Sequence, residues 1–246
     1  MSPMAKMGFA AVFFLGFWKF ITGPSQIQAD VSYPLSYRTH VVGQAGSGDR
    51  LPMLIALHGA GADEEDLNGV FEDWQVPVRI VSFRAPARAG RGYTWSYGEG
   101  MSRVEAEAVE KQMFREVAQS LAVGAAEVAA RYPTVGKPMV FGFSRGGSMA
   151  WYLGAHHPEE FDAIFVVAGE LEAIFFKGLN PAIRPPFFAY HGRRDPVVGI
   201  QGGHRTAASI ERLAGQVVFE EFDGGHTVPP SVGSDVEQQI KILRGG

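Results

Sequence analysis

Short apolar runs alternate with longer amphipathic segments from about residue 37 onward, and this alternation is the first indication of the fold. The apolar runs are rich in Val, Ile, Phe and Tyr, and most are uninterrupted, as expected of parallel strands covered on both faces. Polar or Gly-containing stretches separate them. We expect strands at residues 37–42, 53–59, 78–83, 138–143, 161–169, 186–192 and 216–222.

The segments between these runs have the periodicity of helices. The longest covers residues 104–131, and shorter ones are predicted near 147–156, 204–214 and 234–243. Alternating strands and helices predict an α/β fold with a mostly parallel central sheet flanked by helices on both faces. On the longest helix, one face carries Val109, Met113, Val117, Leu121, Ala125 and Val128 at intervals of three or four residues.

The N-terminus departs from this pattern. A purely apolar run of twelve residues lies between Lys6 and Lys19 and is followed by a polar segment. A membrane-spanning helix needs about 20 apolar residues, whereas the core of a signal peptide needs about 7–15. We therefore expect residues 1–29 to be a signal peptide with cleavage near Ala29, an uncleaved membrane anchor being the alternative. Residues 30–246 then form one domain of a protein exported to the periplasm or secreted.

Composition narrows the functional classes. With 246 residues, 46% of them hydrophobic, the chain can build one sizeable core. A net charge of −4, without a cluster of basic and aromatic residues, argues against nucleic-acid binding. The absence of cysteine excludes disulfides, thiolate metal sites and a cysteine nucleophile. We expect neither a cofactor nor a metal, and we interpret the acidic run in "HGAGADEED" as a helix start, where carboxylates meet the helix dipole.

Ser144 is the candidate nucleophile. It lies in "GFSRG" (142–146), a G-x-S-x-G pentapeptide that chance alone could supply in a chain with 31 glycines. Here, however, a predicted strand comes directly before it and a predicted helix directly after it. A sharp strand-to-helix turn of this kind lifts a serine hydroxyl above the sheet, while the glycines relieve crowding.

A serine nucleophile needs a base, and the base needs an orienting carboxylate. Asp195 follows the strand at 186–192, and His226 follows the strand at 216–222. Both lie at the carboxyl end of a strand, the edge where open α/β sheets bind ligands. We prefer Asp195 over its competitors, which are Asp223, Glu170 and Glu172.

The oxyanion of such a reaction needs backbone N–H donors. One is expected from Arg145, directly after the nucleophile, and the second from Ala60 in the "LHGAG" loop. The alternative is that Gly59 and Gly61 only serve a tight turn. The irregular segment 84–100 contains Tyr93, Trp95 and Tyr97, and we expect it to form a pocket wall.

The motifs "LHGAG", "GFSRGGSMA", "HGRRDPVV" and "GGHTVP" together resemble the α/β-hydrolase superfamily, and within it the compact phospholipase/carboxylesterase group, which includes acyl-protein thioesterases and bacterial carboxylesterases. The resemblance covers about residues 37–243 and implies an α/β-hydrolase fold without a separate cap domain. Its implied roles are nucleophile for Ser144, acid for Asp195, base for His226, oxyanion donors for Ala60 and Arg145, and substrate-pocket positions for Trp95, Tyr93, Glu170 and Leu171.

Three departures from the group stand out. Arg145 replaces the Gln that is common after the nucleophile, and the "RAGRGY" and "AGELEAIFF" segments are not typical. These departures concern substrate preference more than mechanism, because the oxyanion bond uses the backbone of residue 145. What the Arg145 side chain selects is left open by the sequence.

The sequence thus predicts a cofactor-free serine hydrolase that cleaves small carboxylic esters through an acyl-enzyme. The alternatives are a thioesterase, lysophospholipase or peptidase with the same triad, or a catalytically silent hydrolase-fold binding protein. Contact with a membrane is expected only through an uncleaved N-terminal segment.

Overall fold

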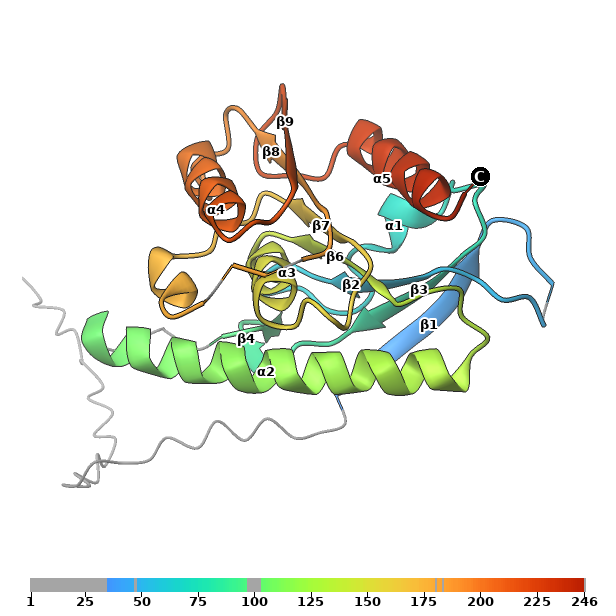
Figure 1. Cartoon of the computed structure of the whole chain (residues 1–246), viewed down its shortest axis with the longest axis horizontal. Helices are drawn as coiled ribbons and strands as arrows, with labels where there is room; N and C mark the ends of the chain where they lie inside the picture. The colour runs from blue at the N-terminus through green and yellow to red at the C-terminus, as the bar shows by residue number, and fades with distance from the viewer. Residues whose placement is uncertain (1–34, 47, 97–102, 180, 183, 246) are drawn as a thin grey trace, which may run out of the picture.

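The computed structural model describes residues 35–46, 48–96, 103–179, 181–182 and 184–245 (Figure 1). The predicted signal peptide or anchor, residues 1–29, lies outside this part of the chain, as does Tyr97. Among the helices that are described, none combines the length and the apolar character needed to cross a bilayer.

A seven-stranded sheet forms the centre of the molecule, with strand order β1-β3-β2-β6-β7-β8-β9. Only β1, at one edge, is antiparallel to its neighbour β3, and all other pairs are parallel. The mostly parallel sheet predicted from the apolar runs is therefore confirmed. Its strands are β1 (Tyr37–Val42), β2 (Met53–Leu57), β3 (Val78–Phe83), β6 (Met139–Phe143), β7 (Ile164–Val167), β8 (Phe187–Gly192) and β9 (Val217–Phe222).

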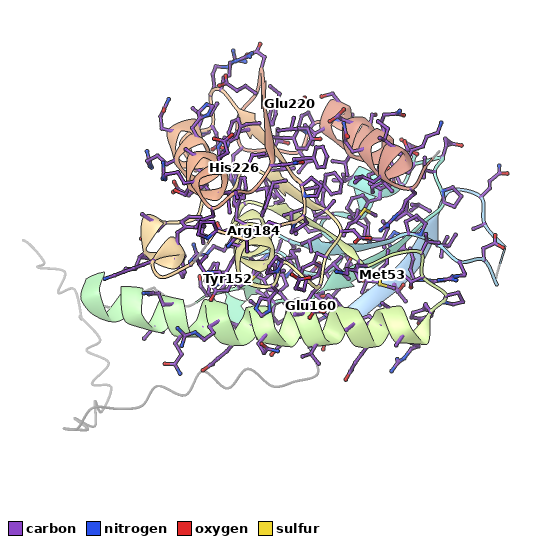
Figure 2. All side chains as sticks on the ribbon, in the orientation of Figure 1. Met53, Tyr152, Glu160, Arg184, Glu220 and His226 are labelled. Atoms are coloured by element: carbon purple, nitrogen blue, oxygen red, sulfur yellow. The ribbon has the colours of Figure 1, made fainter. Side chains whose placement is uncertain are left out.

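Helices cover both faces of the sheet, as the sequence predicted (Figure 1). On β2, Ile55 and Leu57 join the core under α2, α3 and α4, whereas Leu54 and Ala56 join the core under α1 and α5. Side chains fill both layers (Figure 2). The helices are α1 (Asn68–Phe71), α2 (Arg103–Arg131), α3 (Arg145–His156), α4 (Ile200–Arg212) and α5 (Pro230–Leu243).

Several short elements were not predicted. The segment after β3, which we expected to be irregular, contains a hairpin of β4 (Ala87–Ala89) and β5 (Gly92–Thr94), and a 3₁₀ turn η1 (Ala173–Phe176) follows β7. Strands of three residues are too short to show a period in the sequence. None of the described elements forms a separate cap domain.

The interpretation of the acidic run as a helix start was wrong. Residues 64–67 form turns ahead of α1, whose first turn contains no acidic residue. Glu64 is instead buried and accepts hydrogen bonds from Arg84, with Nε 2.6 Å from Oε2, and Arg38 lies 3.4 Å away. The hydrogen bond from Arg84 is the main cause that lowers the pKa of Glu64 to about 2. A partly buried ion pair therefore decided the position of this carboxylate.

Candidate active site

Ser144 occupies the sharp turn between β6 and α3. Its backbone has φ 55° and ψ −117°, a combination that L-residues rarely adopt. The turn is held to the sheet by the Ser144 N–H, which donates to the Val167 carbonyl at 2.9 Å. Such strained backbone is typical of functional turns that the surrounding structure fixes in place.

The two glycines of the pentapeptide are required by backbone packing. A Cβ atom on Gly142 would lie 2.2 Å from the Gly146 carbonyl oxygen, and one on Gly146 would lie 2.1 Å from the Leu57 carbonyl oxygen. Because both obstacles are backbone atoms, neither could move aside cheaply. The pentapeptide therefore has a packing reason in this fold, independent of any chemistry.

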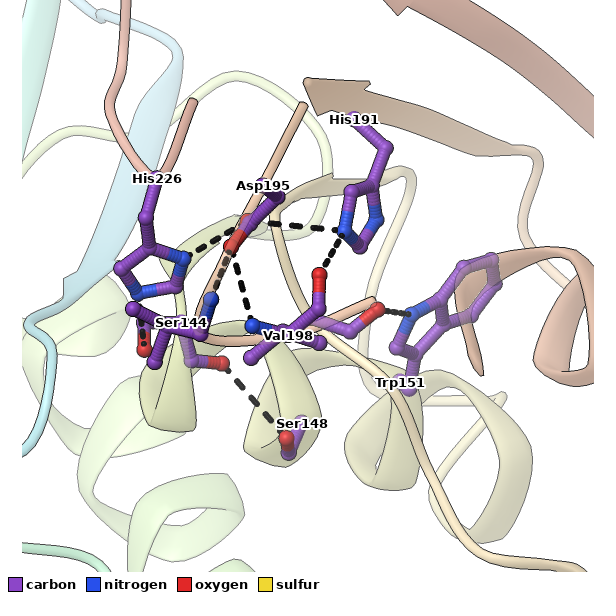
Figure 3. A network of polar contacts seen from close by, with 9 residues as sticks. Ser144, Ser148, Trp151, His191, Asp195, Val198 and His226 are labelled. Carbon is purple, nitrogen blue, oxygen red and sulfur yellow. Dashed lines mark hydrogen bonds and ion pairs between the residues drawn. The ribbon is translucent and has the colours of Figure 1, made fainter. Parts of the chain in front are cut away.

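Ser144, His226 and Asp195 form one hydrogen-bonded chain (Figure 3). The Oγ of Ser144 lies 2.9 Å from Nε2 of His226, and Nδ1 of His226 lies 2.7 Å from Oδ2 of Asp195. Since an ionised carboxylate only accepts, Nδ1 carries the hydrogen and Nε2 accepts from the serine hydroxyl. The structure thus brings together three residues that the sequence placed on separate loops.

The Asp195 carboxylate is fully buried and well supplied with donors. Its Oδ1 accepts the backbone N–H groups of Val197 at 2.8 Å and Val198 at 2.9 Å. Burial alone would raise the pKa of Asp195, but the hydrogen bonds from His226 and from these two N–H groups outweigh it and lower the pKa below its usual value. The competitor Asp223 forms an exposed ion pair with Arg194.

The loop after β2 lies beside Ser144. The strand ends at Leu57, two residues before the predicted end, and a Cβ on Gly59 would lie 3.5 Å from the Ser144 Cβ. The loop is fixed to β5, because the Gly61 N–H donates to the Tyr93 carbonyl at 2.8 Å.

The two backbone N–H groups expected to bind the oxyanion belong to Ala60, in the loop after β2, and to Arg145, directly after Ser144. In the part of the chain that the structure describes, no acceptor is found for the N–H of Ala60, which is exposed. Arg145 is the first residue of α3, at the end of the helix where the backbone N–H groups carry the positive end of the helix dipole.

His58 is a residue whose structural role the sequence did not reveal beyond its place in the "HGAG" turn. It is 1% exposed, its Nε2 accepts the Ala85 N–H at 3.1 Å, and its Nδ1–H donates to the Gly59 carbonyl at 2.7 Å. Burial is the main cause that lowers the pKa of His58, which favours the neutral ring that both bonds require. The ring therefore ties the Gly59–Gly61 loop to the segment after β3.

The predicted pocket residues fall into two groups. Trp95 is fully buried, and its Nε1–H donates to the His58 carbonyl at 2.8 Å. Tyr93 is half-buried, with the guanidinium groups of Arg84 and Arg88 at 4.8 Å and 4.4 Å from its ring. Both residues therefore contact the loop after β2: Trp95 through the His58 carbonyl, and Tyr93 through its own carbonyl, which accepts the Gly61 N–H.

Glu170 and Leu171 lie in the segment that follows β7. The Glu170 side chain is 43% exposed and lies 3.6 Å from Arg205, whereas Leu171 is buried and its N–H donates to the Thr206 hydroxyl. A Cβ on Gly147 of α3 would lie 3.2 Å from the Cα of Gly169, so the end of β7 packs directly against the start of α3.

The Arg145 side chain connects the turn at Ser144 to the segment after β5. Its Nε donates to the Ser96 hydroxyl at 2.8 Å, and its guanidinium lies 4.9 Å from the centre of the Phe114 ring. Burial lowers the pKa of Arg145 to about 10, although Glu172 and Glu170 oppose this shift. The guanidinium remains charged at neutral pH, so the site contains a buried cation next to the candidate nucleophile.

Comparison with known proteins gives a family and a set of structural relatives. The model of the phospholipase/carboxylesterase family matches residues 40–244. No curated protein matches the chain. Over the described residues, no group of three or more His, Asp or Glu side chains is placed to hold a metal ion.

Among solved structures, esterase PE8 is 24% identical with a TM-score of 0.68, and the alignment covers 85% of this chain and 99% of that one. The carboxylesterase of Bacillus cereus is 17% identical with a TM-score of 0.69, covering 86% and 95%. Acyl-protein thioesterase 2 of Zea mays is 18% identical with a TM-score of 0.64, covering 85% and 99%. At these identities the likeness shows a shared fold.

Proposed function

The chain belongs to the phospholipase/carboxylesterase family of α/β-hydrolases, and from this premise we propose that it is a serine hydrolase that cleaves carboxylic esters through an acyl-enzyme intermediate. The observation that carries the proposal is the hydrogen-bonded chain from Ser144 through His226 to Asp195. A serine that only stabilised a turn would not need a buried acid and an oriented histidine aligned behind its hydroxyl.

In the acylation step, Oγ of Ser144 attacks the ester carbonyl carbon while Nε2 of His226 takes the hydroxyl proton. The carbonyl π-bond opens, and the negative charge on its oxygen is stabilised by the N–H groups of Ala60 and Arg145. His226 then gives the proton to the departing alcohol as the ester C–O bond breaks. In deacylation, water attacks the acyl-enzyme, His226 takes its proton, and Ser144 leaves with that proton as the carboxylic acid is released.

The electrostatics of the site support these steps. The lowered pKa of Asp195 keeps its carboxylate ionised near neutral pH, so that it stabilises the imidazolium formed on His226. The first turn of α3 directs its N-terminal partial positive charge toward the oxyanion. Each preorganised N–H donor in such a site is worth about 10²–10³-fold in kcat.

Replacement of Ser144 tests the proposal directly. Ser144→Ala is expected to abolish hydrolysis of a chromogenic short-chain ester and covalent labelling by a fluorophosphonate probe, because no oxygen nucleophile remains. Ser209→Ala, on the surface of α4, is the matched control and should behave as the wild-type enzyme. Unchanged turnover in Ser144→Ala would refute the assignment of the nucleophile, and a wild-type protein that neither reacts nor hydrolyses would indicate a silent binding protein.

The kind of acyl bond is tested with an oxyester, a thioester and an amide of the same acyl group. The proposal requires the highest kcat/KM for the oxyester. A higher value for the thioester or the amide would instead assign a thioesterase or a peptidase that uses the same residues.

A further inference from the structure

A second histidine lies against the Asp195 carboxylate. His191 is the second-last residue of β8, four residues before Asp195; its side chain is 2% exposed, and its Nε2 lies 3.6 Å from Oδ2 of Asp195 (Figure 3). The same Nε2 lies 2.8 Å from the carbonyl oxygen of Val198. Since a carbonyl oxygen only accepts hydrogen bonds, Nε2 of His191 carries the hydrogen.

Val198 is consequently held at both ends of its backbone. Its N–H donates to Oδ1 of Asp195, and its carbonyl accepts from His191. The turn that wraps the carboxylate is therefore closed by the imidazole ring of His191. The same Nε2 lies 3.6 Å from Oδ2, the oxygen that accepts the hydrogen bond from His226, so the ring also packs against that side of the carboxylate.

The surroundings of His191 leave the ring little freedom. A Cβ atom on Gly203 of α4 would lie 2.7 Å from Nδ1 of His191 and 3.0 Å from the Phe219 ring. The Phe219 ring lies nearly parallel to the imidazole, at 14° and a centroid distance of 6.4 Å. The absence of a side chain at position 203 thus makes room for this ring next to the acid.

We propose that His191 is a positioning residue for the ester hydrolysis: it fixes the 195–198 turn and holds the Asp195 carboxylate in line with Nδ1 of His226. This inference rests on the proposed function. His191 acts by aligning the acid and not by contacting the nucleophile, because Asp195 and His226 lie between His191 and Ser144. Its effect should therefore be on the chemical step rather than on substrate binding.

Two variants with side chains of similar length distinguish the effect of the N–H donor from the effect of the ring volume. His191→Gln keeps an N–H donor near the position of Nε2, whereas His191→Met removes it. We expect His191→Met to lower kcat about 10- to 100-fold with KM within about 2-fold, because misplacement of a catalytic group by about 1 Å costs up to about 100-fold. His191→Gln should recover most of kcat, while the melting temperatures of the two variants are similar.

Gly203→Ala perturbs the same contact from α4, by pushing a methyl group against Nδ1 of His191, and it should also lower kcat without a matching rise in KM. Gly199→Ala, at the residue that caps the start of α4, is the control, since nothing lies within 4 Å of the added Cβ, and its kcat should be unchanged. If His191→Met does not fold, the comparison of Gly203→Ala with Gly199→Ala decides the question.

Wild-type kcat in His191→Met or in Gly203→Ala would overturn the inference. The inference would also be overturned if His191→Gln were no more active than His191→Met at equal folded fraction. In that case the ring itself, and not its N–H donor, would be what matters. These results leave the proposed function standing as long as the wild-type enzyme hydrolyses the ester and reacts with the fluorophosphonate probe. A wild-type protein that does neither would overturn the function and this inference with it.

Discussion

The strained backbone at Ser144 predicts an unusual order of stability among variants that lack the hydroxyl. Ser144→Ala and Ser144→Gly both lose the hydrogen bond to His226, and they differ only in the Cβ atom. In most positions glycine is the less stable of the two, because it loses more conformational freedom on folding. At φ 55° and ψ −117° the order should be reversed, since glycine adopts this conformation without a steric penalty.

The magnitude follows from two opposing contributions. A non-glycine residue held in a sparsely populated region costs about 1–3 kcal/mol, and glycine costs about 0.5–1 kcal/mol more than alanine in conformational entropy. Ser144→Gly should therefore be more stable than Ser144→Ala by about 0.5–2 kcal/mol. In a chain of this size about 1 kcal/mol corresponds to about 2–4 °C, so the melting temperature should differ by about 1–8 °C.

Urea denaturation of both inactive variants at one pH measures this difference as a shift of the midpoint at constant slope. Ala208→Gly, in the regular helix α4, calibrates the ordinary effect and should destabilise by about 1 kcal/mol. A Ser144→Gly variant that is less stable than Ser144→Ala would refute the reasoning, because the turn would then carry no strain that a Cβ atom causes.

Two further predictions concern the surroundings of the site. Gly92→Ala places a Cβ 2.1 Å from the Gly61 carbonyl oxygen and should displace the loop that carries Ala60, lowering kcat by up to about 10²–10³-fold. Steady-state kinetics test this, and Gly69→Ala, with nothing within 4 Å, should retain wild-type kcat; equal activity of the two variants would contradict it. The depressed pKa of Glu64 stabilises the fold fully above its unfolded value near 4.5 and progressively less as the pH falls toward about 2. The stability difference between wild type and Glu64→Gln, measured by urea unfolding, should therefore narrow from pH 6 to pH 3, and a constant difference would argue against the ion pair with Arg84.

Local patterns in the sequence predicted most of the regular structure. The strands at 37–42 and 78–83 have the predicted bounds, and the long helix differs from its prediction by one residue at its start. Uninterrupted apolar runs and a 3.6-residue period are properties of neighbouring residues, so they can be recognised without knowledge of the fold. The short hairpin β4–β5 and the 3₁₀ turn η1 were missed because they have too few residues to show a period.

Interactions between distant residues account for the remaining differences. The acidic run was assigned to a helix start because nothing in its neighbourhood indicates that Arg84, twenty residues later, binds Glu64. The strand after "LP" stops at Leu57 rather than at Gly59, since His58 turns inward to bond the backbone of Ala85. Tertiary partners thus overruled a local preference in both cases.

For the candidate site, the sequence by itself determined which residues could take part: a serine in a strand-to-helix turn, followed in order by Asp195 and His226 at strand ends. Their hydrogen-bonded contact was decided by the strand order β6-β7-β8-β9. This order places the loops of all three residues at one edge of the sheet, although His226 lies 31 residues after Asp195 and 82 residues after Ser144 in the sequence. Only the tertiary structure gave a place to His191, whose ring fits beside Asp195 because Gly203 of another element has no side chain. Sequence patterns specify local backbone and burial, whereas such contacts depend on strand order and packing between elements, which no stretch of neighbouring residues encodes.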